Sequence, residues 1–304
     1  MEKVRIAVIG TGHLGSHHAR IYSQLQDVEL VGVCDIDAEK AKKVAEAAGC
    51  AFYTDYRELI EKIDAVSIVV PTKLHHKIAK EFLSNGISAL IEKPITTTLQ
   101  EADELLEIAK ARGLILQVGH VERFNAAVQA IEKFAKSPRF IECHRLGPFT
   151  TRGTDVGVVL DLMIHDIDIV LGMVKSPIER LDAVGVNVLT PYEDIANARI
   201  IFQNKAVADL TASRLTPEAQ RKIRIFVEDA YISLDYVKQV ASIYRKKDGN
   251  ITHSTIDIEK EEPLKRELEA FIKCVKNKEK PLVSGVEGRN ALAVALEIID
   301  KIKA

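Results

Sequence analysis

The sequence predicts an α/β protein with an N-terminal, doubly wound parallel sheet, followed by a C-terminal α+β domain with a large, mostly antiparallel, open-faced sheet. Up to about residue 118, short apolar runs alternate with longer amphipathic runs, which is typical of βαβ units. A glycine-rich segment directly follows the first apolar run. Beyond about residue 120, β-rich runs follow one another with turns between them. The 304 residues suffice for two domains, which we predict to be residues 1–120 and 121–304.

The strands of the first domain are predicted where apolar residues are consecutive, the pattern of strands buried on both faces. These runs are Val4–Ile9, Leu30–Cys34, Ala65–Val70, Ser88–Ile91 and Ile115–Val118. Amphipathic runs between them predict helices over His13–Leu25, Ala38–Ala48, Leu74–Asn85 and Leu99–Arg112. Gly49, Gly86 and Gly113 follow three of these helices, where a C-cap favours glycine.

The second domain begins with two predicted helices, Asn125–Lys136 and Val158–Met173, and two more close the chain, Leu264–Lys276 and Glu287–Lys303. Between these pairs, β-branched or alternating runs predict strands separated by turn signals. The strands are Arg180–Leu189, Ile195–Phe202, Ala206–Arg214, Arg221–Val227, Tyr231–Leu234, Val240–Arg245 and Thr255–Ile258. We expect helices to cover one face of this sheet and the other, apolar face to form an interface between copies of the chain.

Charge and cysteine content exclude several classes of protein. Lys and Arg total 42 and Asp and Glu total 44, so the formal charge of -2 leaves no broad basic surface for nucleic acid or anionic lipid. No apolar run is long enough for a membrane span, and the first residues are too short an apolar stretch for a signal peptide. The four cysteines lack metal-site spacing, so we predict no bound metal. Isolated thiols suit a reducing compartment, which predicts a cytoplasmic protein.

The segment Gly10-Thr11-Gly12-His13-Leu14-Gly15 is a GxGxxG motif between a predicted strand and a predicted helix. In a Rossmann fold, these glycines permit a tight turn, a close approach to a pyrophosphate, and close packing of helix on strand. The helix N-terminus then binds the pyrophosphate. Asp35 ends the second strand, where a carboxylate binds the ribose hydroxyls, and Ile36 follows it. Because no arginine is nearby, Asp35 favours NAD over NADP.

Glu92-Lys93-Pro94 follows the predicted strand Ser88–Ile91. Ligands of open α/β sheets bind beyond the carboxyl ends of the strands, so Lys93 is expected beside a nicotinamide. Pro94 favours an extended conformation at Lys93. A lysine in this position can stabilise negative charge developing on a substrate oxygen or relay a proton. A lysine at such a turn can equally be an ordinary solvated residue.

Asp161 and His165 are four residues apart on the predicted helix Val158–Met173, so they share a face. Their neighbours are mostly apolar, and polar groups in such surroundings need partners or a cavity. Histidine is suited to act as a general base near neutral pH, and a neighbouring carboxylate can set its tautomer and basicity. Alternatively, Asp161 and His165 are a surface or helix-capping pair without a chemical role.

These three sites, in this order, resemble the Gfo/Idh/MocA oxidoreductases over nearly the whole chain. The resemblance implies that residues 1–120 form a Rossmann NAD-binding domain and that residues 121–304 bind substrate. It also implies a homo-oligomer, a dimer or a tetramer, formed through the open sheet. The expected reaction is an NAD-dependent oxidation of a secondary hydroxyl, of the EC 1.1.1 type, on a sugar or cyclitol. Lys93 and His165 are expected to handle the proton, with Asp161 beside them as the third catalytic residue.

Position within the family pattern assigns the remaining site residues. Those expected at the cofactor are Gly10, Thr11, Gly12, His13, Leu14, Gly15, Asp35, Ile36, Pro71, Thr72, His75, Glu92 and Lys93. Those expected at the substrate are Lys93, Arg123, Asn125, Arg152, Asp161 and His165.

Residues 117–125 and 154–166 resemble one branch of the family, which is similar to UDP-N-acetylglucosamine 3-dehydrogenases. The chain departs from this branch at Ala126, where the branch usually has proline. The resemblance implies oxidation of the 3-hydroxyl of the sugar nucleotide to the 3-keto sugar. Arginine suits a diphosphate, and the candidates are Arg123, Arg145, Arg152 and Arg214. Two alternatives stay open: an inositol or other sugar dehydrogenase, and a non-catalytic NAD-binding regulator of the same fold.

Overall fold

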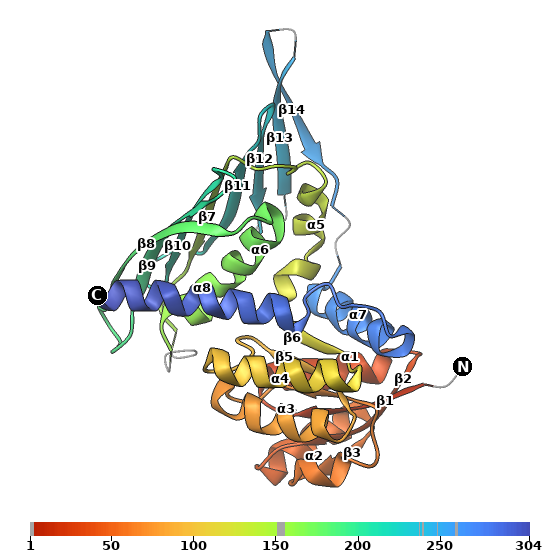
Figure 1. Ribbon diagram of the computed structural model, residues 1–304. Coiled ribbons are helices and arrows are strands. Elements are labelled where there is room, and N and C mark those ends of the chain that lie inside the picture. Colours follow the sequence, from red (N-terminus) through yellow and green to blue (C-terminus); the bar gives the residue numbers. More distant parts are fainter. Residues whose placement is uncertain (1–2, 151–155, 237, 239, 248, 259–260) are drawn as a thin grey trace. The chain divides into compact units, whose positions relative to one another are not determined.

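A computed structural model describes residues 3–150, 156–236, 238, 240–247, 249–258 and 261–304. The chain separates into two compact units, Met1–Val121 with Glu262–Arg289, and Glu122–Glu261 with Asn290–Ala304, and each contains one sheet (Figure 1). Helix α7 (Pro263–Asn277) belongs to the first unit, whereas the division at residue 120 assigns it to the second domain. The reason is its apolar face, since Leu268, Phe271 and Ile272 pack into the core of the first sheet.

The sheet of the first unit is parallel, with the strand order β3-β2-β1-β4-β5-β6. Its strands are β1 (Val4–Ile9), β2 (Val28–Cys34), β3 (Ala51–Tyr53), β4 (Ala65–Ile68), β5 (Ser88–Glu92) and β6 (Leu116–Gly119). Its helices are α1 (His13–Gln24), α2 (Ala38–Ala48), α3 (His75–Ser84) and α4 (Leu99–Arg112), besides α7. Every residue of β4, β5 and β6 is buried, as expected of strands covered on both faces. The predicted doubly wound parallel sheet is confirmed, and Gly49 and Gly113 cap α2 and α4 as predicted.

The sheet of the second unit has the strand order β14-β13-β12-β11-β7-β10-β9-β8. Its strands are β7 (Phe140–Leu146), β8 (Ile178–Val186), β9 (Ile195–Phe202), β10 (Val207–Ser213), β11 (Gln220–Phe226), β12 (Ala230–Asp235), β13 (Val240–Lys247) and β14 (Asn250–Ile256). Only β7 and β10 pair in parallel among the strand pairs described in this sheet. The prediction of a large, mostly antiparallel sheet is therefore confirmed.

One face of this sheet is covered and the other is open. Helices α5 (Ala126–Glu132) and α6 (Ile164–Val174) lie on the covered face, together with the part of α8 (Gly285–Lys303) that begins at Asn290 (Figure 1). The open face carries a ladder of rings, one on each of the adjacent strands β7, β11, β12, β13 and β14. Its members are Phe140, Phe226, Tyr231, Tyr244 and His253, with successive ring centroids 5.7, 4.9, 5.4 and 4.6 Å apart.

Several elements differ from the sequence prediction, among them the short strand β3 (Ala51–Tyr53), which was not predicted. Strand β7 was not predicted, because its charged residues on both faces hide the alternation of buried Ile141 and Cys143 with more exposed neighbours. Strand β14 begins at Asn250 rather than at Thr255. The helix predicted over Val158–Met173 begins with a π-helical turn, η4 (Val159–Met163), before α6. Within the described part of the chain, no helix combines the length and the apolar character that crossing a membrane requires.

Candidate functional site

The turn between β1 and α1 has the geometry of a dinucleotide-binding loop. Gly10 has a φ of 95°, and a Cβ atom on it would lie 2.1 Å from the carbonyl oxygen of Val69, so only glycine fits there. A Cβ atom on Gly15 would lie 1.9 Å from the carbonyl oxygen of Gly10. By contrast, a Cβ atom on Gly12 would meet nothing within 4 Å. Gly12 caps α1 without a side-chain hydrogen bond, which leaves the first-turn amides for an anion on this open side.

Asp35 ties this turn to the end of β2. One carboxylate oxygen accepts hydrogen bonds from the amide and hydroxyl of Thr11, at 2.7 and 2.9 Å, and the other accepts from the amide of Asp37 at 3.0 Å. Ile36 is 96% exposed and offers an apolar surface for an adenine ring. Lys40 pairs with Asp37 at 3.0 Å, so its charge is already engaged. The open turn, the carboxylate and the apolar side chain together fit NAD.

The buried carboxylate of Glu92 fixes the strand end that carries Lys93. Its Oε1 lies 3.3 Å from Nε2 of His18, and its Oε2 accepts from the amide of Lys93 at 3.3 Å. His18 lies fully buried on α1 and also contacts Oγ of Ser67 through Nδ1, at 2.8 Å. Gly119 lies opposite Glu92 on β6, and a Cβ atom there would come within 2.8 Å of the carboxylate. The carboxylate therefore occupies the space that a side chain at Gly119 would fill.

His75 links the loop after β4 to the loop after β5. Its ring is 1% exposed and lies between the carbonyl oxygens of Val70, 2.8 Å from Nε2, and of Pro94, 2.9 Å from Nδ1. Burial lowers the pKa of His75, and the two carbonyl oxygens act in the opposite direction. Pro71 and Thr72 lie at the start of the 3-10 turn that leads into α3. His75 thus connects two loops that were both expected at the cofactor.

Asp161 and His165 lie in the second unit, on the helix formed by η4 and α6. A π-helical turn is rare and frequently occurs at functional sites. Both side chains are half-buried, whereas Met163 and Ile164 between them are fully buried. The two polar residues therefore share the less buried face of this helix.

The hairpin between β8 and β9 holds the start of this helix. The buried Glu193 accepts two hydrogen bonds there. Its carbonyl oxygen bonds to the amide of Val158 at 3.0 Å, and its carboxylate bonds to the amide of Val159 at 3.2 Å. A Cβ atom on Gly157 would lie 1.9 Å from the carboxylate, so this contact requires glycine. A negative charge at a helix N-terminus is also electrostatically favourable.

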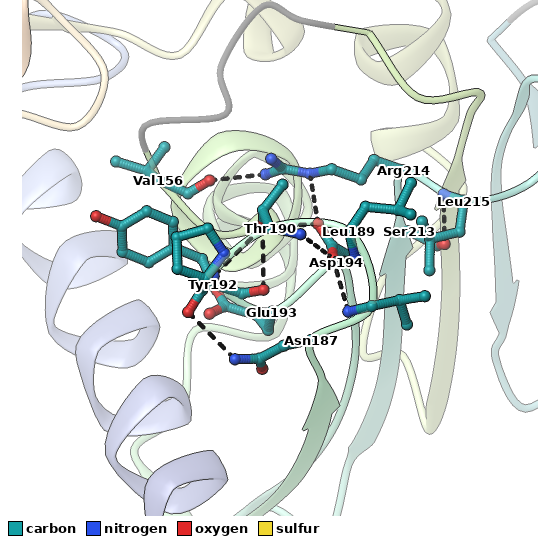
Figure 2. Close-up of polar contacts among 12 residues, drawn as sticks. Val156, Asn187, Leu189, Thr190, Tyr192, Glu193, Asp194, Ser213, Arg214 and Leu215 are labelled. Carbon is teal, nitrogen blue, oxygen red and sulfur yellow. Dashed lines mark hydrogen bonds and ion pairs between the residues drawn. The ribbon is translucent and has the colours of Figure 1, made fainter.

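Asp194 shapes the hairpin itself (Figure 2). Its buried carboxylate accepts hydrogen bonds from the amides of residues 188–190, at 2.6–2.9 Å, and from the hydroxyl of Thr190, at 2.8 Å. Burial would raise the pKa of Asp194, but these hydrogen bonds outweigh burial and lower it to about 2. Arg214, which follows β10, lies 3.9 Å from Asp194 and donates to the carbonyl of Val156 at 2.8 Å. The hairpin and the segment before η4 are thus joined by one network.

Arg145, near the end of β7, is the centre of a second buried network. Its guanidinium contacts both carboxylate oxygens of Asp166, at 2.9 and 2.8 Å, and one of Glu122, at 2.9 Å. Burial would raise the pKa of Glu122, but the charge of Arg145 outweighs burial and lowers it. Three of the five N–H donors of Arg145 are therefore taken by two carboxylates.

Arg123 is engaged within the second unit as well. It is 7% exposed, and its guanidinium lies 3.6 Å from the carboxylate of Asp168. A Cβ atom on Gly172 of α6 would come within 2.4 Å of this guanidinium. Arg152 lies outside the described residues. A substrate contact by either arginine remains a prediction.

Asn125 caps helix α5. Its Oδ1 accepts from the amide of Ala127 at 3.0 Å, and its Nδ2 donates to Glu122 at 3.2 Å. Ala126, where the similar branch has proline, is the first residue of α5. Proline is favoured at this position because its missing amide hydrogen is not needed there, and alanine is an equally good helix former. The departure from the branch therefore leaves the local structure intact.

A cavity of about 210 Å³ lies where β7 and β10 end and β11 begins. Asp161 and Leu162 of η4 contribute to its lining. Three arginines also line it: Arg145, Arg214 and Arg221. Arg145 and Arg214 were among the candidate phosphate ligands, whereas Arg221 was not.

Comparison with known proteins decides the family. Residues 4–120 match the model of an oxidoreductase family with an NAD-binding Rossmann fold, and residues 126–233 match the GFO/IDH/MocA C-terminal domain. The chain belongs to the Gfo/Idh/MocA family of oxidoreductases. It is an NAD-dependent oxidoreductase, and the turn at Gly10–Gly15 lies in the domain that binds NAD in this family.

Relatives within the Gfo/Idh/MocA family differ in substrate. The chain is 36% identical to a UDP-N-acetylglucosamine 3-dehydrogenase of Acidithiobacillus ferrooxidans, over 100% of this chain and 99% of the relative. A solved structure of that enzyme covers the same shares of both chains with a TM-score of 0.95. The chain is also 28% identical to an NAD-dependent scyllo-inositol 2-dehydrogenase of Bacillus subtilis, over 97% and 92%. A myo-inositol 2-dehydrogenase of Thermotoga maritima is 26% identical over 95% and 93%.

Several residues that build this site were not predicted from the sequence. His18 has a weak signal, since it is a histidine among the apolar residues of the α1 core face. Glu193 and Asp194 lie in a polar stretch with the composition of an ordinary turn. Only their burial distinguishes them from the other polar residues of such a turn. Arg221 begins a predicted strand with several other cations. Whether Arg221 can bind a ligand depends on which neighbouring arginines already contact carboxylates or carbonyl oxygens.

Proposed function

We propose that this oxidoreductase oxidises the 3-hydroxyl of UDP-N-acetylglucosamine to the corresponding 3-keto sugar. The observation that carries the proposal is the 36% identity over full length to an enzyme of that name. The TM-score of 0.95 with the structure of that enzyme supports it, because the substrate domain is matched as fully as the NAD domain. An inositol dehydrogenase is the second candidate, favoured by relatives at 28% and 26% identity.

In the proposed reaction, Lys93 and His165 handle the proton of the substrate hydroxyl. His165 accepts this proton on a ring nitrogen, and Asp161 on the preceding turn sets the tautomer and basicity of the ring. Lys93 donates a hydrogen bond to the substrate oxygen as negative charge develops on it. NAD, when bound, supplies the acceptor for the hydride that leaves the same carbon. The substrate loses one proton and one hydride, and the C–O single bond becomes a carbonyl.

The remaining site residues bind or position the cofactor in this proposal. The turn Gly10–Gly15 holds the pyrophosphate, Asp35 binds the ribose hydroxyls, and Ile36 covers the adenine. Thr11, His13 and Leu14 belong to the same turn. Pro71, Thr72, His75 and Glu92 shape the strand ends at which the nicotinamide is expected. His75 and Glu92 are buried, so their contribution is to position the backbone around them.

We further propose that copies of the chain associate through the open face of the second sheet. Val184 and Val186 on β8 are 61% and 51% exposed, and Phe226 in the ring ladder is 38% exposed. An apolar surface of this kind normally marks an interface. Sedimentation at micromolar concentration is expected to give a dimer or a tetramer, and Phe226→Asp is expected to weaken it. A monomer at that concentration would contradict this assignment.

We also propose a cytoplasmic location, since the four free cysteines suit a reducing compartment.

One assay separates the candidate functions. The purified protein is incubated with NAD and, in turn, UDP-N-acetylglucosamine, N-acetylglucosamine, myo-inositol and scyllo-inositol, and NADH formation is followed by absorbance. The proposal expects turnover with the sugar nucleotide and a product that carries a 3-keto group by NMR. Faster turnover of an inositol would establish the second candidate. Bound NAD without turnover of any substrate would favour the regulator.

A further inference from the structure

Among the described residues that line the cavity at the end of the second sheet, one cation has no hydrogen-bonded or ion-paired partner. Of the three arginines that line the cavity, Arg145 contacts the carboxylates of Asp166 and Glu122. Arg214 is also engaged, through the carbonyl of Val156 and the nearby carboxylate of Asp194. Neither guanidinium can turn toward a ligand without leaving a buried carboxylate or carbonyl without its partner.

Arg221 differs from both of these arginines. It lies opposite Arg145 in the register between β11 and β7, so both side chains point to the same face of the sheet. Unlike Arg145, which is 4% exposed, Arg221 is an exposed residue. Among the residues that the structure describes, none forms a hydrogen bond or ion pair with its guanidinium. Its charge does help to lower the pKa of Glu122, but the carboxylate oxygens of Glu122 already accept from Arg145 and Asn125.

The charges around this cavity are therefore asymmetric. Arg221 supplies a cation on the β11 side, and Asp161 supplies a carboxylate on the η4 side. The planar guanidinium fork matches the oxygens of a phosphate and binds them with two hydrogen bonds. An anionic group would be attracted to Arg221 and repelled by Asp161, which leaves the neutral, hydroxyl-bearing end of a ligand for the Asp161 side.

We propose that Arg221 binds the diphosphate of the substrate and thereby selects a sugar nucleotide over an uncharged sugar or cyclitol. This inference rests on the proposed function and assigns the substrate selectivity to one residue.

The first test measures binding without turnover. UDP is titrated into the NAD-saturated protein by calorimetry, with inorganic pyrophosphate as a second probe. Arg221→Gln is expected to weaken UDP binding about ten- to a hundredfold, the range for loss of a charge-assisted contact. Arg221→Lys keeps the charge and is expected to retain part of the affinity. Lys222→Gln is the matched control, because it removes one positive charge from the adjacent position of the same strand, where the side chain points to the other face.

The second test compares substrates. With UDP-N-acetylglucosamine, Arg221→Gln is expected to raise KM about ten- to a hundredfold and to change kcat much less, because the diphosphate is bound equally in the ground and transition states. Activity with any uncharged sugar or inositol that the wild-type protein oxidises is expected to stay within about twofold of wild type. Circular dichroism and thermal unfolding establish that the variant remains folded.

The outcomes separate this inference from the proposed function. Equal UDP affinity in wild type, Arg221→Gln and Lys222→Gln would overturn the inference while leaving turnover of the sugar nucleotide intact. Failure of the wild-type protein to bind either UDP or pyrophosphate would overturn it as well. If the wild-type protein binds UDP through Arg221 but oxidises only inositols, the proposed substrate is wrong and the anion site stands.

Discussion

The two units of the chain stabilise buried carboxylates by different means. In the first unit, the buried Glu92 lies against the imidazole of His18 and against a backbone amide. In the second unit, Asp166 and Glu122 contact the permanently charged Arg145. Asp194 accepts three backbone amides and one hydroxyl. The carboxylate in the first unit therefore has few close partners, whereas those in the second unit have a permanent counter-charge or several hydrogen-bond donors.

This difference bears on how each unit positions the side chains that we propose to be reactive. Lys93 follows a strand end whose position depends on Glu92 and, through Pro94, on His75. Asp161 and His165 belong to a helix whose first turn is held by Glu193 and whose α6 segment is tied to β7 through Asp166. Substitutions that act on one arrangement and not on the other test the comparison.

The largest expected effect is the loss of the proton-handling residues, one in each unit. Lys93→Met and His165→Ala are each expected to lower kcat about a hundredfold to ten-thousandfold, the usual range for a general acid–base group. NAD affinity is expected to stay nearly unchanged in both variants. The double variant should be little worse than the poorer single variant, because residues that act as one unit give non-additive losses. Steady-state kinetics of the three proteins provide the measurement.

The same variants can contradict the assignment in two ways. Losses that multiply in the double variant would show that Lys93 and His165 serve different steps. A His165→Ala protein with near-normal kcat would leave Asp161 and His165 as a polar pair on a packed helix.

The next largest effect concerns the frame of the second unit. Arg145→Met is expected to lower the free energy of unfolding by about 3–5 kcal/mol, because it leaves the carboxylates of Asp166 and Glu122 buried without a counter-charge. Lys205→Met is the control, since the Lys205–Glu179 pair, at the turn before β10, is 76% and 46% exposed and should contribute about 1 kcal/mol or less. Urea unfolding of both variants gives the comparison. A loss for Arg145→Met no larger than for the control would contradict the role given to this network.

How far the sequence predicts these two arrangements depends on the kind of interaction. The GxGxxG turn, Asp35 and the position of Lys93 at a strand end follow from local pattern, because strands buried on both faces are continuous apolar runs. Strand β7 was not predicted because it carries Glu142, His144 and Arg145. Its buried arginine is stabilised by carboxylates that are distant in the sequence.

Candidate ligands are harder to predict than elements for the same reason. Arg145 and Arg214 resemble Arg221 in the sequence, yet the fold engages the first two and leaves Arg221 exposed at the cavity. Which arginine can bind a ligand depends on which carboxylates and carbonyls already bind the others. That information lies in tertiary contacts and in no single segment.

A pH-dependent effect of intermediate size is expected from the hairpin. The pKa of Asp194 is lowered from 3.8 to about 2, so in the unfolded chain this group binds a proton at a higher pH than in the folded protein. Its contribution, about 2 kcal/mol, is therefore fully present above pH 4 and is lost as the pH falls from about 4 to about 2. Asp194→Asn should lower stability at pH 7 and flatten the stability profile between pH 4 and pH 2, measured by urea unfolding. A parallel profile in variant and wild type would show that other carboxylates cause the acid sensitivity.

The smallest expected effect concerns the strand end of the first unit. His18→Asn removes the ring nitrogen that lies 3.3 Å from Glu92, while the shorter amide can still reach Ser67. The loss of this 3.3 Å contact with a buried carboxylate predicts a fall in kcat of about threefold to tenfold. If His18 positions Lys93 through Glu92, kcat should fall while KM for the sugar nucleotide stays constant, because the substrate domain is untouched. Ser67→Ala, which leaves the contact between His18 and Glu92 in place, should give a smaller loss. A rise in KM for NAD with kcat unchanged would instead place the effect of His18 on the glycine-rich turn at the start of α1, and the role of Glu92 in positioning Lys93 would then be wrong.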